Sequence, residues 1–385
     1  MTEHGLKKVY LVTLGSRLVN YSSPGVVLVK KGAMPSERYN IRVGILFAVL
    51  LDTFTLGSSY RIVLYLANVA SDSSNVELQK SLRSLHAVFL SQHQPYPVFI
   101  AYDKKDRGHL TPQLKTLLAE QINATPTDFN DPRCLQGATI SFLPIASFQQ
   151  IPWPFSMYGD IYQEKNPYYA RLGYRLMCRF WAHTVFNQSF MRNVTSYLRL
   201  DTDTYLVDMP VDPFNILEDE GIAYLSSIVY HESPLQVEGL WETILRFAYN
   251  EGIHPWGLTP LSNEHRHEDI FSIHDIQQMP LREAVDLLYQ RGYNLKYFYN
   301  NWEASRVDIW TSPVYQRLAR HIDAAGGIIL RRWGDAPIRT LSLHLLRNEF
   351  AGIVGLSHDQ PFRQYRGLAV HHKMLHRTTG NETFI

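Results

Sequence analysis

Residues 197–208 read YLRLDTDTYLVD, and this stretch decides the fold class and the chemistry of the chain. Two aspartates, Asp201 and Asp203, stand one residue apart directly after the short apolar strand predicted over residues 196–200. Acids that follow a strand lie at the edge of a sheet, where open α/β folds bind their ligands. Two carboxylates there can hold a divalent cation that grips a nucleotide diphosphate, although such a pair is as common on a solvated loop.

The segments before these aspartates alternate between strand and helix patterns. Apolar runs rich in strand-forming residues are separated by stretches in which apolar residues recur at helical spacing. Strands are predicted over residues 61–70, 97–102 and 139–143, and helices are predicted to start near Leu78 and at Thr111. This order is typical of a parallel sheet covered by helices, so we predict an α/β fold.

The remaining elements are less regular. Further helices are predicted over residues 168–186, 233–248 and 313–325, and further strands over residues 222–230 and 328–330. Residues 252–279 show no clear period, and we interpret them as a variable surface excursion. No stretch of the chain has the composition of a linker between two independent domains.

Composition narrows the function classes. The chain has 385 residues, of which 45% are hydrophobic and 19% charged, so one large globular domain is expected. The formal net charge is +1 and no block of like charge occurs, which excludes a nucleic-acid footprint. The aromatic content of 12% fits either an aromatic core or a sugar-stacking site. The two cysteines, Cys134 and Cys178, can form one disulfide at most.

The N-terminal region is ambiguous. Residues 43–51 are apolar and follow several basic residues, but Asp52 interrupts the run. This pattern fits either a short signal-anchor at residues 41–57 or a buried strand or helix, because a confident span needs about 20 apolar residues. We therefore predict an N-terminal segment over residues 1–58 and a catalytic domain over residues 59–385. Five N-glycosylation triplets, the first at Asn20, indicate a secretory compartment.

Three other segments carry polar side chains that could belong to a site. Glu303 follows an aromatic run, and taken alone it is best interpreted as an exposed charge. Asp335 stands just before Pro337, where a helix cap is the default interpretation. His371 and His372 lie in a polar tail, where they are either solvated or ligands that complete a metal site with the aspartates.

Taken together, these segments resemble the fungal Golgi α-1,2-mannosyltransferases, glycosyltransferase family 15. The similarity runs from about Arg61 to His372 and keeps the order and approximate spacing of the family's motifs. The matching segments are YRLMCRF at residues 174–180, YLRLDTD at 197–203, DPF at 212–214 with ED at 218–219, FYNNWE at 298–303, and AGG at 325–327 followed by RWGDAP at 332–337.

The resemblance implies a fold and an activity. The expected fold is a single Rossmann-like type A glycosyltransferase fold, with a mixed, mainly parallel sheet flanked by helices. The expected reaction transfers mannose from GDP-mannose to a mannose-containing glycan acceptor, with an α-1,2 linkage, retention of configuration and Mn²⁺ as the metal. The expected location is the lumen of the Golgi or secretory pathway, as a type II membrane protein if residues 41–57 span the membrane.

The resemblance also implies roles for individual residues. Asp201 and Asp203 would hold the metal and diphosphate, with His371 or His372 as the third protein ligand. Glu303 would lie beneath the anomeric carbon, either as the nucleophile of a double displacement or as a stabiliser of an oxocarbenium-like transition state. The remaining expected donor or acceptor contacts are Tyr174, Arg179 and Arg199 on the donor side, Asn301, and Trp333 and Asp335 facing the sugars.

The chain departs from the family pattern at several positions. Asp201 stands where the family has Glu, and Thr202 replaces a Pro. Lys296 stands where the family often has Cys, which leaves Cys178 without the usual bridge partner. Two alternatives therefore stay open: a hexosyltransferase of the same fold that uses a UDP-sugar, and a non-catalytic glycan-binding member with a crippled site. Binding of GDP against UDP, and donor hydrolysis without acceptor, discriminate among them.

Overall fold

The computed structural model describes two separate units of the chain. The described residues are 11–14, 17–21, 27–28, 60–128, 131–135, 137–146, 151, 155, 171–219, 221–263, 271–351, 362–364 and 369–372. The units are Met1–Gly57 and Ser58–Ile385. Residues 41–57 lie outside the described residues, so the predicted anchor and the predicted boundary between residues 58 and 59 stay predictions. No helix in the described ranges is long and apolar enough to cross a membrane.

In the smaller unit, three short strands form an antiparallel sheet. They are β1 (Leu11–Leu14), β2 (Arg17–Tyr21) and β3 (Val27–Leu28), with β2 in the middle.

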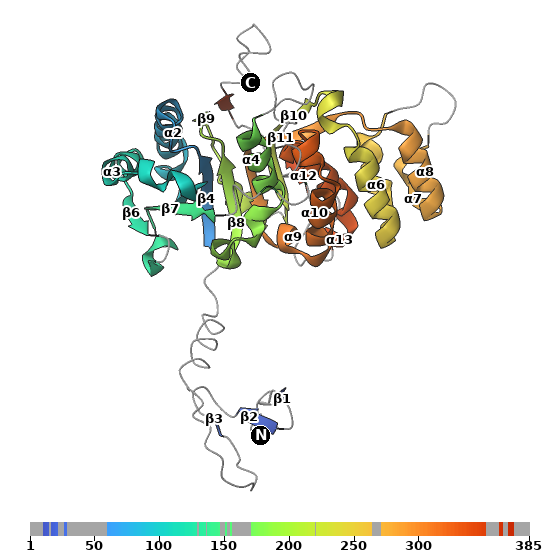
Figure 1. The fold of residues 1–385 in the computed structure, drawn as a ribbon, viewed down its shortest axis with the longest axis horizontal. Coiled ribbons are helices and arrows are strands. Elements are labelled where there is room, and N and C mark those ends of the chain that lie inside the picture. The colour runs from blue at the N-terminus through green and yellow to red at the C-terminus, as the bar shows by residue number, and fades with distance from the viewer. Residues whose placement is uncertain are drawn as a thin grey trace. The chain divides into compact units, whose positions relative to one another are not determined.

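The larger unit is built on an eight-stranded mixed sheet (Figure 1). In spatial order its strands are β12 (Phe362–Gln364), β10 (Tyr224–His231), β11 (Lys296–Arg306), β8 (Val194–Leu200), β4 (Tyr60–Ala67), β5 (Val98–Asp103), β7 (Thr139–Ile145) and β6 (Thr125–Asp128). Only β11 runs antiparallel to its neighbours, and every other pair in this sheet is parallel. The predicted mixed, mainly parallel sheet is confirmed.

Helices cover both faces of this sheet. On one face lie α4 (Leu172–Ala182), α6 (Leu240–Glu251), α8 (Leu281–Arg291), α10 (Pro313–Ala325) and α12 (Asp335–Leu345), and on the other α2 (Asp72–Leu85), α3 (Pro112–Glu120) and α5 (Pro213–Asp219). Strand β4 shows the two cores directly, because Ile62 and Leu64 pack into the first and Val63 and Tyr65 into the second. The sheet is therefore a central layer buried on both sides.

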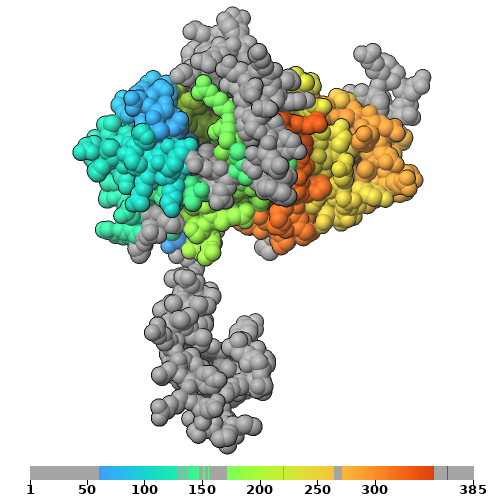
Figure 2. Space-filling model, in the orientation of Figure 1, coloured from blue at the N-terminus to red at the C-terminus, as the bar shows by residue number. Residues whose placement is uncertain are grey.

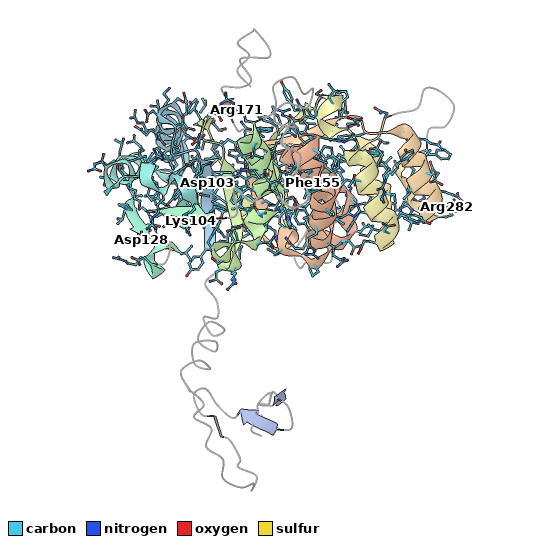
Figure 3. The ribbon with its side chains drawn as sticks, viewed as in Figure 1. Asp103, Lys104, Asp128, Phe155, Arg171 and Arg282 are labelled. Carbon is cyan, nitrogen blue, oxygen red and sulfur yellow. The ribbon has the colours of Figure 1, made fainter. Side chains whose placement is uncertain are left out.

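Shorter elements fill the connections. They are the π-helix His86–Leu90, the 3₁₀ segments Lys104–His109, Pro132–Leu135, Thr184–Asn187, Ser189–Asn193, Pro234–Val237 and Pro255–Leu261, and the helices α7 (Ile273–Gln278), α9 (Asp308–Thr311), α11 (Gly327–Leu330) and α13 (Arg347–Ala351). Figure 2 shows the blue and cyan residues of the first part of this unit at one side, and the yellow and light orange residues that include α6 to α8 at the other. The side chains of Asp128 on β6 and Arg282 on α8 mark those two ends (Figure 3).

Two predicted helix starts have the expected chemistry. Thr111 accepts a hydrogen bond from the Leu114 N–H at the start of α3, and Ser312 accepts one from the Tyr315 N–H at the start of α10. Both helices have Pro directly after the cap, where its missing N–H costs nothing. Helix α10 ends at Gly326, whose φ of +74° suits glycine better than any other residue.

Two elements in the second half of the chain differ from the sequence-based expectation, one predicted wrongly and one not predicted. Residues 328–330 were predicted as a strand, but they form helix α11, because the chain turns at Gly326 and starts a new helical turn at Gly327. Three apolar residues are too few to reveal a period. Strand β11 was not predicted at all, because most of its residues are buried on both faces and show no alternation of apolar and polar side chains.

The close packing of Gly327 makes a testable prediction. A Cβ added there would lie 2.2 Å from the Trp333 ring, so Gly327→Ala is expected to lower the free energy of unfolding by about 1–3 kcal/mol. Gly173→Ala in α4 is the matched control, because nothing lies within 4 Å of its Cβ position. Chemical denaturation of the two variants checks this, and equal midpoints would contradict the packing described.

Candidate functional site

The carboxyl ends of the parallel strands meet at one edge of the large sheet. Strands β8 and β10 run in the same direction, because each is antiparallel to β11 between them. Asp201 follows β8 directly, and its N–H donates a hydrogen bond of 2.9 Å to the carbonyl of Asn301 on β11. In Figure 1 this edge lies at the top of the view, where α4 also begins. Arg171, the residue that precedes α4, is labelled there in Figure 3.

A hollow of about 290 Å³ opens beside the two aspartates. Its lining comes from the end of β4, the first turns of α2, one face of α4 and the turn after β8. The lining residues are Leu66, Ser73, Ser74, Glu77, Met177, Trp181, Asp201, Thr202 and Asp203. Both aspartates therefore lie at a sheet edge, as predicted, and the structure adds that they line the same hollow.

Arg199 joins Asp201 to Asp335. Its Nε and Nη2 lie 3.2 and 3.1 Å from Oδ1 of Asp201, and its Nη1 donates to Oδ2 of Asp335 at 2.6 Å. The guanidinium is 1% exposed and lies 4.1 Å over the ring of Trp181, which lines the hollow. Burial lowers the pKa of Arg199, but the carboxylates of Asp201 and Asp335 raise it by more, so the net pKa is above the usual value. Arg199 is therefore a fixed cation behind the hollow.

Asp335 belongs to this network and is not a helix cap. The N-cap of α12 is Gly334, which has no side-chain cap, and Asp335 is the first helical residue. Its buried carboxylate accepts hydrogen bonds from Arg199 and from Nδ2 of Asn300 at 2.8 Å. The default cap interpretation was wrong, although a carboxylate in the first turn still gains from the helix dipole.

Glu303 is fully buried, so its interpretation as an exposed charge was wrong. It lies on β11 opposite Arg199 and is 0% exposed. Its Oε1 accepts from the Tyr197 hydroxyl at 2.9 Å and pairs with Nη1 of Arg339 at 2.5 Å, while Oε2 accepts from the Tyr224 hydroxyl at 2.8 Å. Glu303 does not line the hollow beside Asp201.

Three further predicted contacts have mixed outcomes. Arg179 forms a two-pronged ion pair with Asp323 of α10 at 2.7 and 2.8 Å and does not line the hollow, so the structure does not place it on the donor side. Trp333 is 3% exposed, donates its indole N–H to the Glu238 carbonyl and does not line the hollow, so its predicted contact with the sugars stays a prediction. Asn301 supports the turn through Thr204, to which its Nδ2 donates.

The backbone brings the histidine pair close to the aspartates. Strand β13 (Ala369–His372) pairs antiparallel with β9 (Thr204–Asp208), which places His371 opposite Tyr205 and His372 opposite Thr204. Their side chains lie outside the described part of the structure, so the choice of ligand stays a prediction. Within the described part, no cluster of three His, Cys, Asp or Glu side chains is arranged to hold a metal.

The residues present fit a hard divalent cation. Asp201 has a side chain that is 32% exposed, and both aspartates line the same hollow. Carboxylate oxygens are the ligands that Mg²⁺ and Mn²⁺ take, usually with water and substrate phosphate in the other positions. The two aspartates could therefore hold a cation that a diphosphate also contacts.

Three charged residues near the site were not predicted from the sequence. Arg339 is the partner of Glu303, and it stands one helical turn after Asp335, so its spacing was a usable signal. Glu232 follows β10 directly. Its burial raises its pKa, and so does the charge of Asp335, although the Ser233 N–H and the charge of Arg332 lower it. Arg332 lies over the ring of Tyr174. The one sequence signal for its role was its position in the same segment as Trp333 and Asp335.

Both cysteines are buried and neither forms a disulfide, so Cys178 lacks a bridge partner, as the Lys296 replacement predicts. Burial, with the nearby charge of Asp335, raises the pKa of Cys178 well above its usual value. The raised pKa favours the protonated thiol, which lies where α4 packs against the start of α12.

Comparisons with solved structures identify the fold of the chain. The core-mannan synthase A (CmsA/Ktr4) of Aspergillus fumigatus, in its Mn/GDP form, has a TM-score of 0.59 at 18% identity, covering 95% of this chain and 87% of that one. The mannosyltransferase Ktr4p of Saccharomyces cerevisiae in complex with GDP has a TM-score of 0.60 at 19% identity, covering 89% and 76%. These similarities confirm the predicted type A glycosyltransferase fold.

Sequence relatives point the same way. The alpha-1,2 mannosyltransferase KTR1 of Saccharomyces cerevisiae is 30% identical over 194 residues, which is 49% of this chain and 44% of that protein. The chain thus spans less than half the length of such relatives. The sequence model described as glycolipid 2-alpha-mannosyltransferase matches residues 155–354, more than half of the chain. The chain therefore belongs to the glycolipid 2-alpha-mannosyltransferase family.

Proposed function

We propose that the chain transfers mannose from GDP-mannose to a mannose-containing glycan with an α-1,2 linkage, retention of configuration and a Mn²⁺ requirement. The observation that carries the proposal is the pair Asp201 and Asp203 lining one hollow at the carboxyl edge of the sheet. Family membership, and the Mn/GDP form of a structure with the same fold, support the donor and the metal.

Asp201 and Asp203 would hold the cation. When bound, a divalent cation offsets the negative charge of the diphosphate leaving group. Arg199 would orient Asp201 for this task, because two of its nitrogens reach Oδ1 of Asp201 while Asp335 and the Trp181 ring fix the guanidinium from the other sides. The partly exposed Asp201 would therefore be preorganised by a buried cation that is held from several sides.

Glu303 would act as a charge stabiliser in this reaction. Both of its oxygens are engaged by tyrosine hydroxyls or by Arg339, and it is fully buried. A carboxylate held in this way supports an oxocarbenium-like transition state through its field more readily than it attacks a carbon. Of the two roles that the family resemblance implies, the stabilising one is therefore better supported.

The secretory pathway is the proposed location. The N-glycosylation triplets, such as Asn193-Val-Thr, support it. An anchor at residues 41–57 stays a prediction.

Nucleotide preference tests the proposed function. Titration calorimetry of the chain with GDP and with UDP, each with and without Mn²⁺, is expected to show GDP binding at least about 10-fold tighter than UDP, a difference of roughly 1.4 kcal/mol. Removal of Mn²⁺ by a chelator should weaken the binding of GDP strongly. Tighter binding of UDP would favour the alternative hexosyl donor, and binding of neither nucleotide would favour a non-catalytic member.

A further inference from the structure

Arg332 has an unusual backbone for an arginine. Its φ is +65°, in the left-handed region that L-residues with long side chains rarely adopt. It lies between α11 and α12, where the buried Trp333 and the start of α12 fix the chain on its C-terminal side. Strained residues of this kind persist where the surrounding structure determines them, and they cluster at ligand sites.

The side chain of Arg332 stacks on one ring, and its charge also lowers the pKa of the nearby Glu232 carboxyl. Its guanidinium carbon lies 4.7 Å from the centre of the Tyr174 ring, and its Nε is buried without a hydrogen-bond partner among the described residues. The neighbouring Arg331 differs, because its Nη1 forms an ion pair of 3.0 Å with Glu238. Stacking uses the flat face of a guanidinium and leaves its N–H edge available for an oxyanion.

Arg332 does not itself line the hollow beside the aspartates, but it stacks on Tyr174 of α4, the helix that also supplies two of the lining residues. Tyr174 precedes Met177 and Trp181 on α4 by three and seven residues, so the three side chains share one helix face, and the latter two line the hollow. On the other side, Asp335 follows Arg332 by three residues and connects through Arg199 to Asp201. Both connections put Arg332 near residues that line the hollow, as a cation separate from the buried Arg199.

We propose that Arg332 binds the β-phosphate of the nucleotide donor, near the hollow that the two aspartates line. This inference rests on the proposed function and adds a residue to it. An arginine fork binds phosphate oxygens with two parallel N–H bonds, and negative charge grows on the β-phosphate as the bond to the sugar breaks. The Tyr174 ring and the fixed backbone hold the fork in place before the donor arrives.

Nucleotide binding with three variants tests this role. Arg332→Asn removes the cation while keeping a residue that tolerates the left-handed backbone, Arg332→Lys keeps the charge without the fork, and Arg331→Gln is the neighbouring control. Calorimetry with GDP and with GMP, in EDTA and in Mn²⁺, measures the contribution of the β-phosphate separately from the metal. Thermal unfolding of each variant checks that it is folded.

The expected result is a loss of GDP affinity of about 10- to 100-fold in Arg332→Asn, a smaller loss in Arg332→Lys, and no loss in Arg331→Gln. GMP affinity should change by less than about threefold in all variants, because GMP has no β-phosphate. Equal GDP affinity in Arg332→Asn and wild type, or equal losses for GDP and GMP, would overturn the inference while leaving the proposed function standing. Failure of the wild type to bind GDP would overturn both.

Discussion

Asp203→Ala is expected to reduce mannosyl transfer by at least about 10³-fold, a loss of roughly 4 kcal/mol of transition-state stabilisation. Asp203 lines the hollow with Asp201, and a cation held by only one of these carboxylates would bind weakly and be poorly placed against the diphosphate. The Mn²⁺-dependent part of GDP binding should disappear with it. The checks are initial rates of transfer from GDP-mannose and calorimetry with GDP in the presence and absence of Mn²⁺.

The control for this variant is Asp208→Ala. Asp208 is exposed at the end of β9 and does not line the hollow, so its loss should leave transfer and GDP binding close to wild type. Because Asp203 is half-exposed, its replacement should change the unfolding midpoint little. Undiminished turnover in a folded Asp203→Ala protein would refute the metal role.

Glu303→Gln is expected to reduce the rate of transfer by about 10²- to 10³-fold while changing donor affinity by less than about threefold. The amide has the shape of the carboxylate but no negative charge to offset the cationic character of the sugar ring in the transition state. Comparing kcat with the dissociation constant for GDP-mannose separates the two effects. A collapse of donor affinity with an unchanged rate for bound donor would show that the assignment of Glu303 is wrong.

The buried ion pair complicates this variant and also supplies its control. Removing the charge of Glu303 leaves Arg339 buried without a counter-charge, which costs about 3–5 kcal/mol of folding free energy. The double variant Glu303→Gln with Arg339→Met removes both charges and should recover much of that stability without recovering transfer. Recovery of transfer in the double variant would mean that Glu303 matters only for folding.

The sequence predicts the first half of the sheet well because its periods are clear. Strands β4, β5 and β7 are apolar runs bounded by polar turns, and α2 and α3 carry apolar residues at helical spacing. Strand β11 was not predicted, because its centre is buried on both faces and its sequence does not alternate between apolar and polar residues. The contacts of Glu303 with Tyr197 and Tyr224 could not be predicted for the same reason, because they depend on β11 lying between β8 and β10.

The site could be predicted where the chain itself brings residues together. Asp201 and Asp203 follow one strand, so their placement needed only the strand and its direction. The position of Arg179 could not be predicted, because helix geometry decides which side a residue faces. Arg179 lies two positions from both Met177 and Trp181, so it points away from the hollow and pairs with Asp323 of α10. The burial of Trp333 could not be predicted, because the sequence does not reveal that Gly327 leaves room for the Trp333 ring.

Product analysis tests the central claim most directly. The chain, GDP-mannose, Mn²⁺ and a simple α-mannoside should yield a product whose new linkage is identified by NMR, with a chelator-treated reaction beside it. We expect a single added mannose in α-1,2 linkage and no product without the metal. Absence of both transfer and donor hydrolysis in the folded protein, or undiminished transfer after Mn²⁺ is removed, would contradict the account.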